Sequence, residues 1–252
     1  MILKNKDRQY LLRTTGDYWP YAEVIIADIY SKFDLRSDDI VLDLGANIGL
    51  FTVKISNKVK KVISIEPEPE NFSILKKNVD MNGLTNVVLV NQALSDKKKV
   101  VKIENIGVES KISNLGNEIQ ADTLDNILSE KNISNPTIIK MDIEGEEKAV
   151  FESTKILKSV REIIVEVHGD ENRESVLKIL KKNGFNIEDT SEFNPVNAIN
   201  EMIRHPISFL SGEKKNKFAL TKLCVGYLCG KRQKPGSLNQ YSNISMYYAK
   251  KI

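Results

Sequence analysis

Short apolar segments recur along the first two thirds of the chain, and glycine or acidic residues follow each of them. The strongest cover residues 41–44, 62–65, 137–143 and 162–167. Apolar runs of this length are typical of strands that are buried on both faces, as in parallel sheets. After Pro69, a residue favoured in the first turn of a helix, Phe72, Leu75 and Val79 recur at helical spacing. The pattern therefore predicts alternating strands and helices in a Rossmann-like, doubly wound α/β fold.

Weaker patterns extend this order toward both ends. They predict strands over 86–90, 98–104 and 185–189, a loop or hairpin over 106–118, and helices over 18–32, 121–128 and 171–182. The length of 252 residues and the hydrophobic content of 41% fit one α/β domain with accessory segments. We expect an N-terminal helical extension over 1–38, the main domain over 39–230 with a candidate lid at 194–217, and a basic C-terminal tail over 231–252.

The composition bears on the compartment of the protein and on whether it has a membrane span, a disulfide or a metal site. No uncharged apolar stretch is long enough to cross a bilayer, and the first residues lack the apolar region of a signal peptide. We therefore expect a cytoplasmic protein without a membrane span. Cys224 and Cys229 fall in a predicted strand at odd separation, which places them on opposite faces and disfavours a disulfide or a shared metal. With only two histidines as well, the sequence assigns no metal ligand.

A tight turn, Gly45-Ala46-Asn47-Ile48-Gly49, follows the first apolar strand. Gly45 and Gly49 have no Cβ, so a ligand or the next helix can approach the backbone, and Asn47 tolerates a positive φ. Glu66 ends the second strand and is expected beside this turn, where its carboxylate can accept hydrogen bonds from both hydroxyls of a ribose. The combination predicts a nucleoside-bearing cofactor. The alternative is a strand-to-helix connection without a ligand.

Two common nucleotide motifs do not fit this turn. The later glycines of G-x-G-x-x-G would fall on Asn47 and Leu50, and G-x-x-x-x-G-K-[ST] is absent. Residues 43–49 instead match D-x-G-x-[GN]-x-G, the first motif of class I S-adenosylmethionine (SAM) methyltransferases. Asp43 can reach the ammonium of the methionine half, and the backbone of the turn can meet its carboxylate. The motif therefore predicts SAM as the cofactor.

A cluster of acids follows the strand at 137–143. Asp142 and Glu144 fall at the C-terminal end of this strand, where open α/β sheets bind ligands. Glu146 and Glu147 begin the next helix, where the macrodipole favours acids, and we interpret them as capping and surface charges. His168 ends the following strand and is the candidate general base or the group that orients a hydroxyl. Asp142 and Glu144 are the alternatives for that role.

Six segments of the chain resemble the FkbM-type SAM-dependent methyltransferases; in order, they are DLGANIGLFTVKIS, IEPEPENFSILKKNVDMNG, LVNQALSD, ADTLDNIL, IKMDIEGEEKAVFES and IVEVHG. The resemblance spans 39–169 and implies a seven-stranded sheet with an antiparallel last strand, here placed at 219–228. It also implies O-methylation of a hydroxyl on a sugar, a glycan or a small-molecule metabolite. The cofactor-binding residues expected are Asp43, Gly45, Ala46, Asn47, Gly49, Glu66, Pro67, Ala93, near the adenine, and Asp142, at the methionine end.

Two other functions stay open at this point. From Lys214 onward the chain has lysines, arginines and tyrosines but no acid, which favours RNA binding and hence a tRNA or rRNA methyltransferase. The net charge of only +3 and the absence of N-P-P-[YFW] after the fourth strand disfavour this alternative. The other function is that of a non-catalytic SAM-binding or partner-binding module, which predicts cofactor affinity without turnover.

Overall fold

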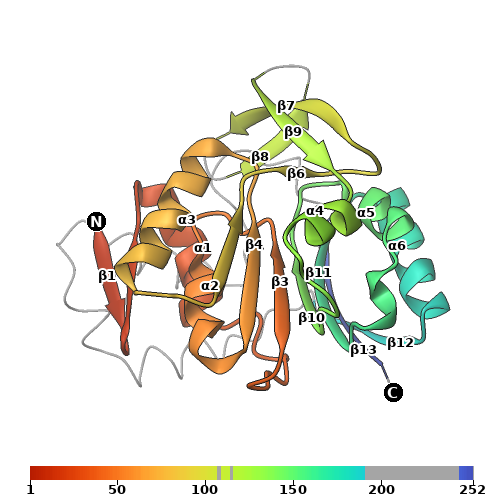
Figure 1. Cartoon of the computed structure of the whole chain (residues 1–252), viewed down its shortest axis with the longest axis horizontal. Coiled ribbons are helices and arrows are strands. Elements are labelled where there is room, and N and C mark those ends of the chain that lie inside the picture. Colours follow the sequence, from red (N-terminus) through yellow and green to blue (C-terminus); the bar gives the residue numbers. More distant parts are fainter. Residues whose placement is uncertain (107–108, 114–115, 191–243, 252) are drawn as a thin grey trace, which may run out of the picture.

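The computed structural model describes residues 1–106, 109–113, 116–190 and 244–251 (Figure 1). A seven-stranded sheet forms its centre, in the order β12-β13-β11-β10-β3-β4-β5. Its strands are β3 (Ile40–Leu44), β4 (Lys61–Ile65), β5 (Val87–Val90), β10 (Ile138–Met141), β11 (Glu162–His168), β12 (Phe185–Asp189) and β13 (Ile244–Lys251). The strands from β5 to β11 pair in parallel, and β13 pairs antiparallel with both β11 and β12. The predicted doubly wound, mostly parallel sheet is confirmed.

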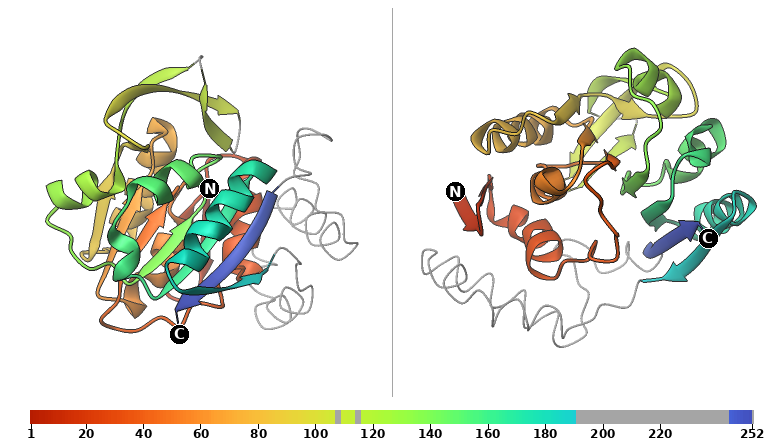
Figure 2. Two further views of the ribbon diagram at one scale, coloured as in Figure 1. Left: turned by 90° about the vertical axis from the view of Figure 1, so that its right-hand side faces the viewer. Right: turned by 60° about the horizontal axis from the view of Figure 1, so that its bottom comes forward.

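Helices cover both faces of this sheet (Figures 1 and 2). One face carries α1 (Tyr18–Tyr21), α2 (Leu50–Ile55) and α3 (Pro69–Met81), and the other carries α4 (Leu124–Glu130), α5 (Glu147–Ser153) and α6 (Asp170–Lys182). Short helical turns lie at η1 (Thr15–Asp17), η2 (Ala22–Ile26), η3 (Ser56–Lys58) and η4 (Ile156–Lys158). Successive strand residues point to opposite faces, so Val41 packs in the core beside α2, and Leu42 packs in the core beside α4 to α6. Each apolar strand segment therefore supplies side chains to two hydrophobic cores, one on each face of the sheet.

In the described part of the chain, the antiparallel strand of the sheet is β13. It lies between β11 and β12, where Ala249 is fully buried and pairs with Ile163 and Ile187. Residues 244–251 are therefore not part of a tail, because Met246 and Tyr247 each complete one of the two cores. The expected strand at 219–228, the two cysteines Cys224 and Cys229, and the candidate lid at 194–217 lie outside the described residues.

A second, four-stranded sheet in the order β6-β9-β7-β8 lies over one end of the main sheet (Figure 1). Its strands are β6 (Ala93–Leu94), β7 (Lys99–Ile106), β8 (Glu109–Ser113) and β9 (Asn117–Asp122). β7 and β8 pair antiparallel, with Ile106 opposite Glu109. The predicted strand at 98–104 corresponds to β7. The only strand that begins in the described part of 106–118 and lies wholly within it is β8, which pairs back with β7, so the hairpin starts earlier than expected.

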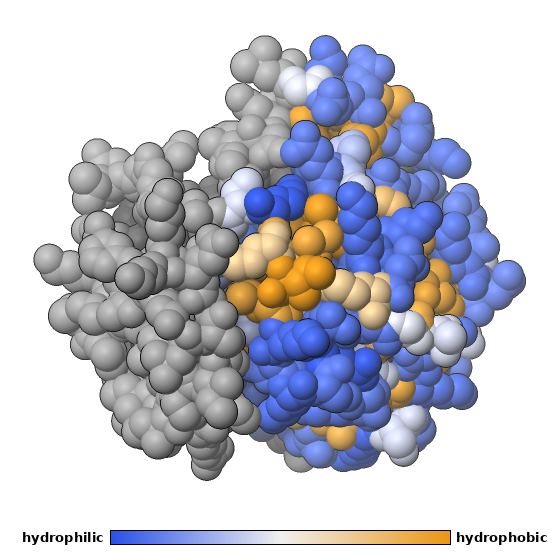
Figure 3. All heavy atoms as spheres, turned by 90° about the vertical axis from the view of Figure 1, so that its left-hand side faces the viewer, coloured by the Kyte–Doolittle hydropathy of each residue, from blue (hydrophilic) through white to orange (hydrophobic). Residues whose placement is uncertain are grey.

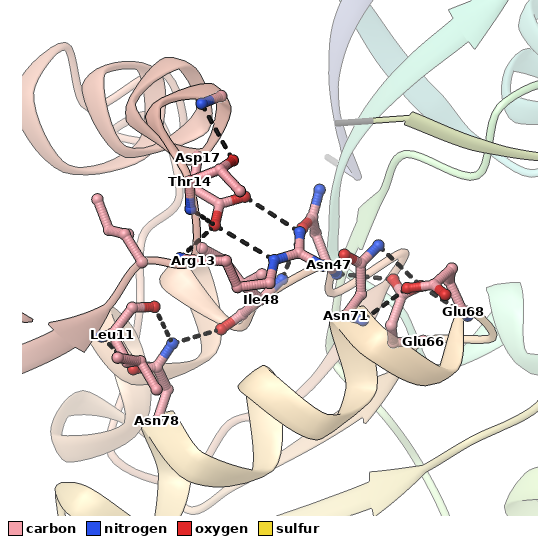
Figure 4. Close-up of polar contacts among 12 residues, drawn as sticks. Leu11, Arg13, Thr14, Asp17, Asn47, Ile48, Glu66, Glu68, Asn71 and Asn78 are labelled. Atoms are coloured by element: carbon pink, nitrogen blue, oxygen red, sulfur yellow. Dashed lines mark hydrogen bonds and ion pairs between the residues drawn. The ribbon is translucent and has the colours of Figure 1, made fainter. Parts of the chain in front are cut away.

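The N-terminal extension differs from the helix that the sequence predicts. It begins with a hairpin of β1 (Ile2–Asn5) and β2 (Arg8–Leu11), and the helical part that follows ends by Ala27. Asp28 has a φ of 50°, which an α-helix does not include, so the predicted helix over 18–32 is too long. Asn78 of α3 ties the hairpin to the core by accepting a 2.5 Å hydrogen bond from Leu11 N and donating to Ile48 O over 2.8 Å (Figure 4).

Figure 3 views the molecule from the side of the N-terminal hairpin. Most of the coloured surface is hydrophilic, and apolar side chains gather near the middle of this face. Met1 and Ile2 are large apolar side chains of the hairpin region that stay exposed, at 41% and 52%. Within the described ranges, none of the helices combines the length and apolar character that a membrane crossing requires.

Candidate active site

The turn between β3 and α2 has the backbone that its glycines predict. Gly45, Asn47 and Gly49 all have positive φ, at 74°, 51° and 83°. A Cβ at Gly45 would lie 1.8 Å from the carbonyl oxygen of Asp142, so β3 and β10 meet here more closely than any side chain would permit. The glycine therefore brings the turn directly against the segment that carries the acidic cluster.

Glu66 lies beside this turn, buried at the end of β4 (Figure 4). Its Oε2 accepts a 2.8 Å hydrogen bond from Asn47 N, and its Oε1 accepts one of 2.9 Å from Glu68 N. Burial raises the pKa of the Glu66 carboxyl to about 7, although these hydrogen bonds and one from Asn71 lower it. Two backbone groups thus hold the carboxylate in place at the site where a ribose was expected.

A pocket at this end of the sheet brings most of the expected residues together. Its lining includes Gly45, Ala46, Asn47, Glu66, Pro67, Ala93, Asp142 and Glu144. The second sheet contributes Leu94 and Ile103 to the same wall as Ala93. A buried carboxylate beside a glycine turn, facing an apolar wall, fits a ribose with its attached adenine. Asp43, Gly49 and His168 are not among the lining residues.

Asp43 lies beneath the pocket and has a buried partner that sequence reasoning missed. Lys140 is the register partner of Asp43 across β3 and β10, and its Nζ lies 3.2 Å from Asp43 Oδ1. The same Nζ donates a 2.6 Å hydrogen bond to Gly45 O. Burial works to lower the pKa of Lys140, but Asp43 and Asp142 outweigh it and the pKa is raised. Lys140 therefore stays charged and connects Asp43 of β3 to Gly45 of the glycine turn.

Beyond the turn, Asp142, Glu144 and His168 converge from the ends of β10 and β11. His168 Nε2 lies 3.2 Å from Glu144 Oε2 and 4.0 Å from Asp142 Oδ1. Glu166, on the same face of β11 as His168, places Oε1 3.8 Å from this nitrogen. Glu144 has a φ of 55°, rare for a residue with a side chain, so the turn after β10 directs its carboxylate into the cluster at some backbone cost.

Glu147 supports this cluster from behind, and its interpretation as a surface charge is wrong. The side chain is fully buried, and its Oε1 lies 3.0 Å from His168 Nδ1 while accepting a hydrogen bond from Gly145 N. Burial lowers the pKa of His168, but the bond to Glu147 and the charges of Asp142 and Glu144 outweigh it and raise the pKa to about 10. Glu146, by contrast, occupies the N-cap position of α5 without a capping hydrogen bond from its side chain, and it lines the pocket.

The N-terminal segment closes the opposite side of the pocket. Pro20, Glu23, Val24, Ile29 and Tyr30 all contribute to the lining. The ring of Tyr30 lies 5.9 Å from Lys140 Nζ. Burial, and then the charges of Asp142 and Glu166, raise the pKa of Tyr30 well above its usual value, which keeps its phenol neutral. The segment that follows the N-terminal hairpin thus supplies a wall of the pocket.

A doubly wound sheet with one antiparallel strand, a glycine turn after β3 and a buried acid at the end of β4 define a class I SAM methyltransferase. The chain belongs to the FkbM methyltransferase family, whose profile, described as the methyltransferase FkbM domain, matches residues 43–187, more than half of the chain. SAM is accordingly the methyl donor.

Known proteins show several degrees of similarity to this chain. The hexuronic acid methyltransferase AglP of Haloferax volcanii is 29% identical over 163 residues, which are 62% of this chain and 67% of that protein. The 23S rRNA (uracil(1939)-C(5))-methyltransferase RlmD of Aliivibrio fischeri is 37% identical over 65 residues, 26% of this chain and 15% of that one. The crystal structure of methyltransferase FkbM from Methylobacillus flagellatus KT is 17% identical with a TM-score of 0.47, covering 69% of this chain and 46% of its own.

Proposed function

We propose that the chain transfers the methyl group of SAM to a hydroxyl of a sugar, a glycan or a small-molecule metabolite. The observation that carries this proposal is the single pocket that joins Glu66 and the glycine turn to the carboxylates Asp142 and Glu144. A hydroxyl can donate its hydrogen bond to such carboxylates, which are acceptors when ionised. The similarity to a protein described as a hexuronic acid methyltransferase supports a sugar as the acceptor.

The cofactor end of the pocket holds the donor in the proposed arrangement. Glu66 accepts hydrogen bonds from the ribose hydroxyls, and Ala93 packs against the adenine. Asp43 acts from beneath through Lys140, which also binds Gly45 O and so holds the turn that meets the methionine half. Gly49 serves the same turn as the N-cap residue of α2, with a φ of 83° and with Leu75 Cδ1 2.4 Å from the place of a Cβ.

The acceptor end positions a hydroxyl for direct transfer. SAM supplies an electrophilic methyl group, so the protein chiefly has to align the acceptor oxygen and exclude water. A carboxylate on this wall, Asp142 or Glu144, accepts the hydroxyl proton. His168 orients both carboxylates, since its imidazole lies within 4.0 Å of each while Glu147 holds its other nitrogen.

An RNA acceptor is the alternative, supported by the short similarity to RlmD. The pocket disfavours it, because five carboxylate side chains line the acceptor side and would repel a phosphodiester. Tyr247 and Tyr248, counted among the residues favouring RNA, belong to β13, and Tyr247 is buried. The carboxylates at this end are Glu23, Asp142, Glu144, Glu146 and Glu166.

Binding of S-adenosylhomocysteine (SAH) is the first test. We expect calorimetry to show SAH binding without NAD or ATP binding, with Glu66→Ala weakening SAH by about tenfold or more because a buried ribose acceptor is lost. Glu70→Ala, an exposed acid on the neighbouring helix α3, is the matched control. Unchanged affinity in Glu66→Ala would remove the ribose assignment.

Methyl transfer from labelled SAM to neutral sugars, uronic acids and tRNA is the second test. We expect label in a hydroxyl compound, with His168→Ala lowering turnover while SAH affinity stays near that of the wild type. Label in tRNA alone would favour the RNA alternative. SAH binding without transfer to any acceptor would favour a non-catalytic module.

A further inference from the structure

The cluster of Asp142, Glu144 and His168 has the composition and spacing of a cation site. One ligand atom from each residue lies within 4.8 Å of the others. His168 Nε2 is 3.2 Å from Glu144 Oε2 and 4.0 Å from Asp142 Oδ1. Around a six-coordinate ion with metal–ligand distances of about 2.1 Å, neighbouring ligand atoms lie about 3.0 Å apart and opposite ones about 4.2 Å. The two measured distances fall between these limits.

The surroundings of His168 prepare its Nε2 for a ligand. Glu147 is fully buried on the side of Nδ1 and accepts its proton over 3.0 Å, so Nε2 is the nitrogen at which a cation can replace the second proton of the ring. In the described part of the chain, His168 Nε2 and Asp142 Oδ1 are both buried atoms that make no hydrogen bond. A carboxylate that holds the second nitrogen of a histidine is the usual support of a metal-bound imidazole.

The charges around the cluster also favour a cation. Glu23, Glu146 and Glu166 line the same pocket as Asp142 and Glu144. Among the lining residues that the structure describes, Lys140 is the only lysine or arginine, and Asp43 and Gly45 O already engage it. Carboxylates gathered in a partly desolvated site repel one another, and a divalent cation offsets more of this repulsion than the single charge of a protonated His168.

We propose that Asp142, Glu144 and His168 bind a divalent cation that holds the acceptor hydroxyl during methyl transfer. This inference rests on the proposed function. Two carboxylates and one imidazole, with positions left for water or a hydroxyl, suit a six-coordinate ion such as Mn²⁺. Coordination lowers the pKa of a bound hydroxyl. Because Asp142 and Glu144 then bind the cation, Glu166 replaces them as the proton acceptor. The hydroxyl proton passes to the Glu166 carboxylate, the acceptor oxygen bonds to the methyl carbon, and the C–S bond breaks with its electron pair on sulfur.

Mn²⁺ is the probe for the test, because electron paramagnetic resonance distinguishes free from protein-bound Mn²⁺. We expect the SAH-loaded full chain to bind one Mn²⁺, and His168→Ala and Glu144→Gln each to weaken it by at least about tenfold. Glu152→Gln is the matched control, since Glu152 is an exposed acid of α5 outside the pocket and its loss should change Mn²⁺ affinity by less than about twofold. SAH titration of each variant reports whether its fold is intact.

The outcomes separate this inference from the proposed function. Wild-type protein that binds SAH but retains no Mn²⁺ overturns the cation site and leaves the methyltransferase proposal standing. Mn²⁺ binding that is unchanged in Glu144→Gln also overturns it, and this variant decides the question if His168→Ala does not fold. Failure of the wild type to bind SAH instead contradicts the proposed function.

Discussion

Glu66 is a carboxyl group with a pKa of about 7, raised mainly by burial. The ionised group accepts ribose hydroxyls better than the neutral one. SAH affinity should therefore rise by up to about tenfold as the pH increases from about 6 to about 8. Calorimetry at constant ionic strength measures this, and Glu66→Gln should bind more weakly with a flat pH profile. Parallel profiles for the two proteins would show that another group controls binding.

The same pKa shift acts on the ligand-free protein with the opposite sign. Because the pKa of Glu66 in the folded state lies above its ordinary 4.5, the folded state holds this proton more tightly than the unfolded chain. The resulting stabilisation is fully present below that ordinary value and is lost as the pH rises through about 7. Without ligand, the Tm of Glu66→Gln relative to wild type should accordingly increase toward higher pH.

Lys140 is the buried cation that compensates Asp43. Lys140→Met should destabilise the fold by about 3–5 kcal/mol, because it leaves Asp43 charged and without its partner at the centre of the sheet. Urea unfolding measures the loss. Adding Asp43→Asn to Lys140→Met should recover part of it, since the uncompensated charge is then gone; a double variant less stable than the single one would contradict this role.

The sequence predicted some of these residues because their signals are local. Glu66 and Asn47 follow directly from a strand end and a turn pattern, and both line the pocket as expected. Lys140 interrupts an apolar run, and its role depends on the register of β10 against β3, which no local pattern contains. Glu147 matched a helix-capping pattern, but its burial arises from the approach of His168 and α6.

The connection from β3 to α2 depends on the close contact at Gly45. Gly45→Ala should prevent stable folding or cost several kcal/mol, because its Cβ would lie 1.8 Å from Asp142 O at a φ of 74°. Gly83→Ala is the matched control, with a φ of 61° and nothing within 4 Å of the added Cβ, and should cost about 1 kcal/mol. Thermal unfolding measures the stability of both variants. Equal losses of stability would show that the positive φ alone, and not the contact with Asp142 O, sets the cost of Gly45→Ala.

At the level of whole elements, prediction succeeded where burial on both faces gave a continuous apolar run, as in β3, β4, β10 and β11. It failed for β13, where two lysines and two tyrosines made residues 244–251 look like a solvated tail, although Met246 and Ala249 are buried. The N-terminal hairpin was missed because β1 and β2 are short and depend on Asn78 of a distant helix for a partner.

The whole molecule relies on β13 to join β12 to the rest of the sheet. Ala249→Asp should unfold the protein or cost more than about 3 kcal/mol, because it places a charge in a fully buried position between β11 and β12. Lys250→Ala, one residue along and with a side chain 47% exposed, should change stability by less than about 1 kcal/mol. Circular dichroism during thermal unfolding compares them, and similar losses would contradict a structural role for this strand.

The position of β13 also matters while the polypeptide is being made. The ribosome produces β11 and β12 first, and the place between them stays empty until residues 244–251 follow. During that interval β11, which ends in His168, has an unpaired edge that other nascent chains can join. The sheet can therefore close only after Lys251 has left the exit tunnel, and methyl transfer should begin only after that moment.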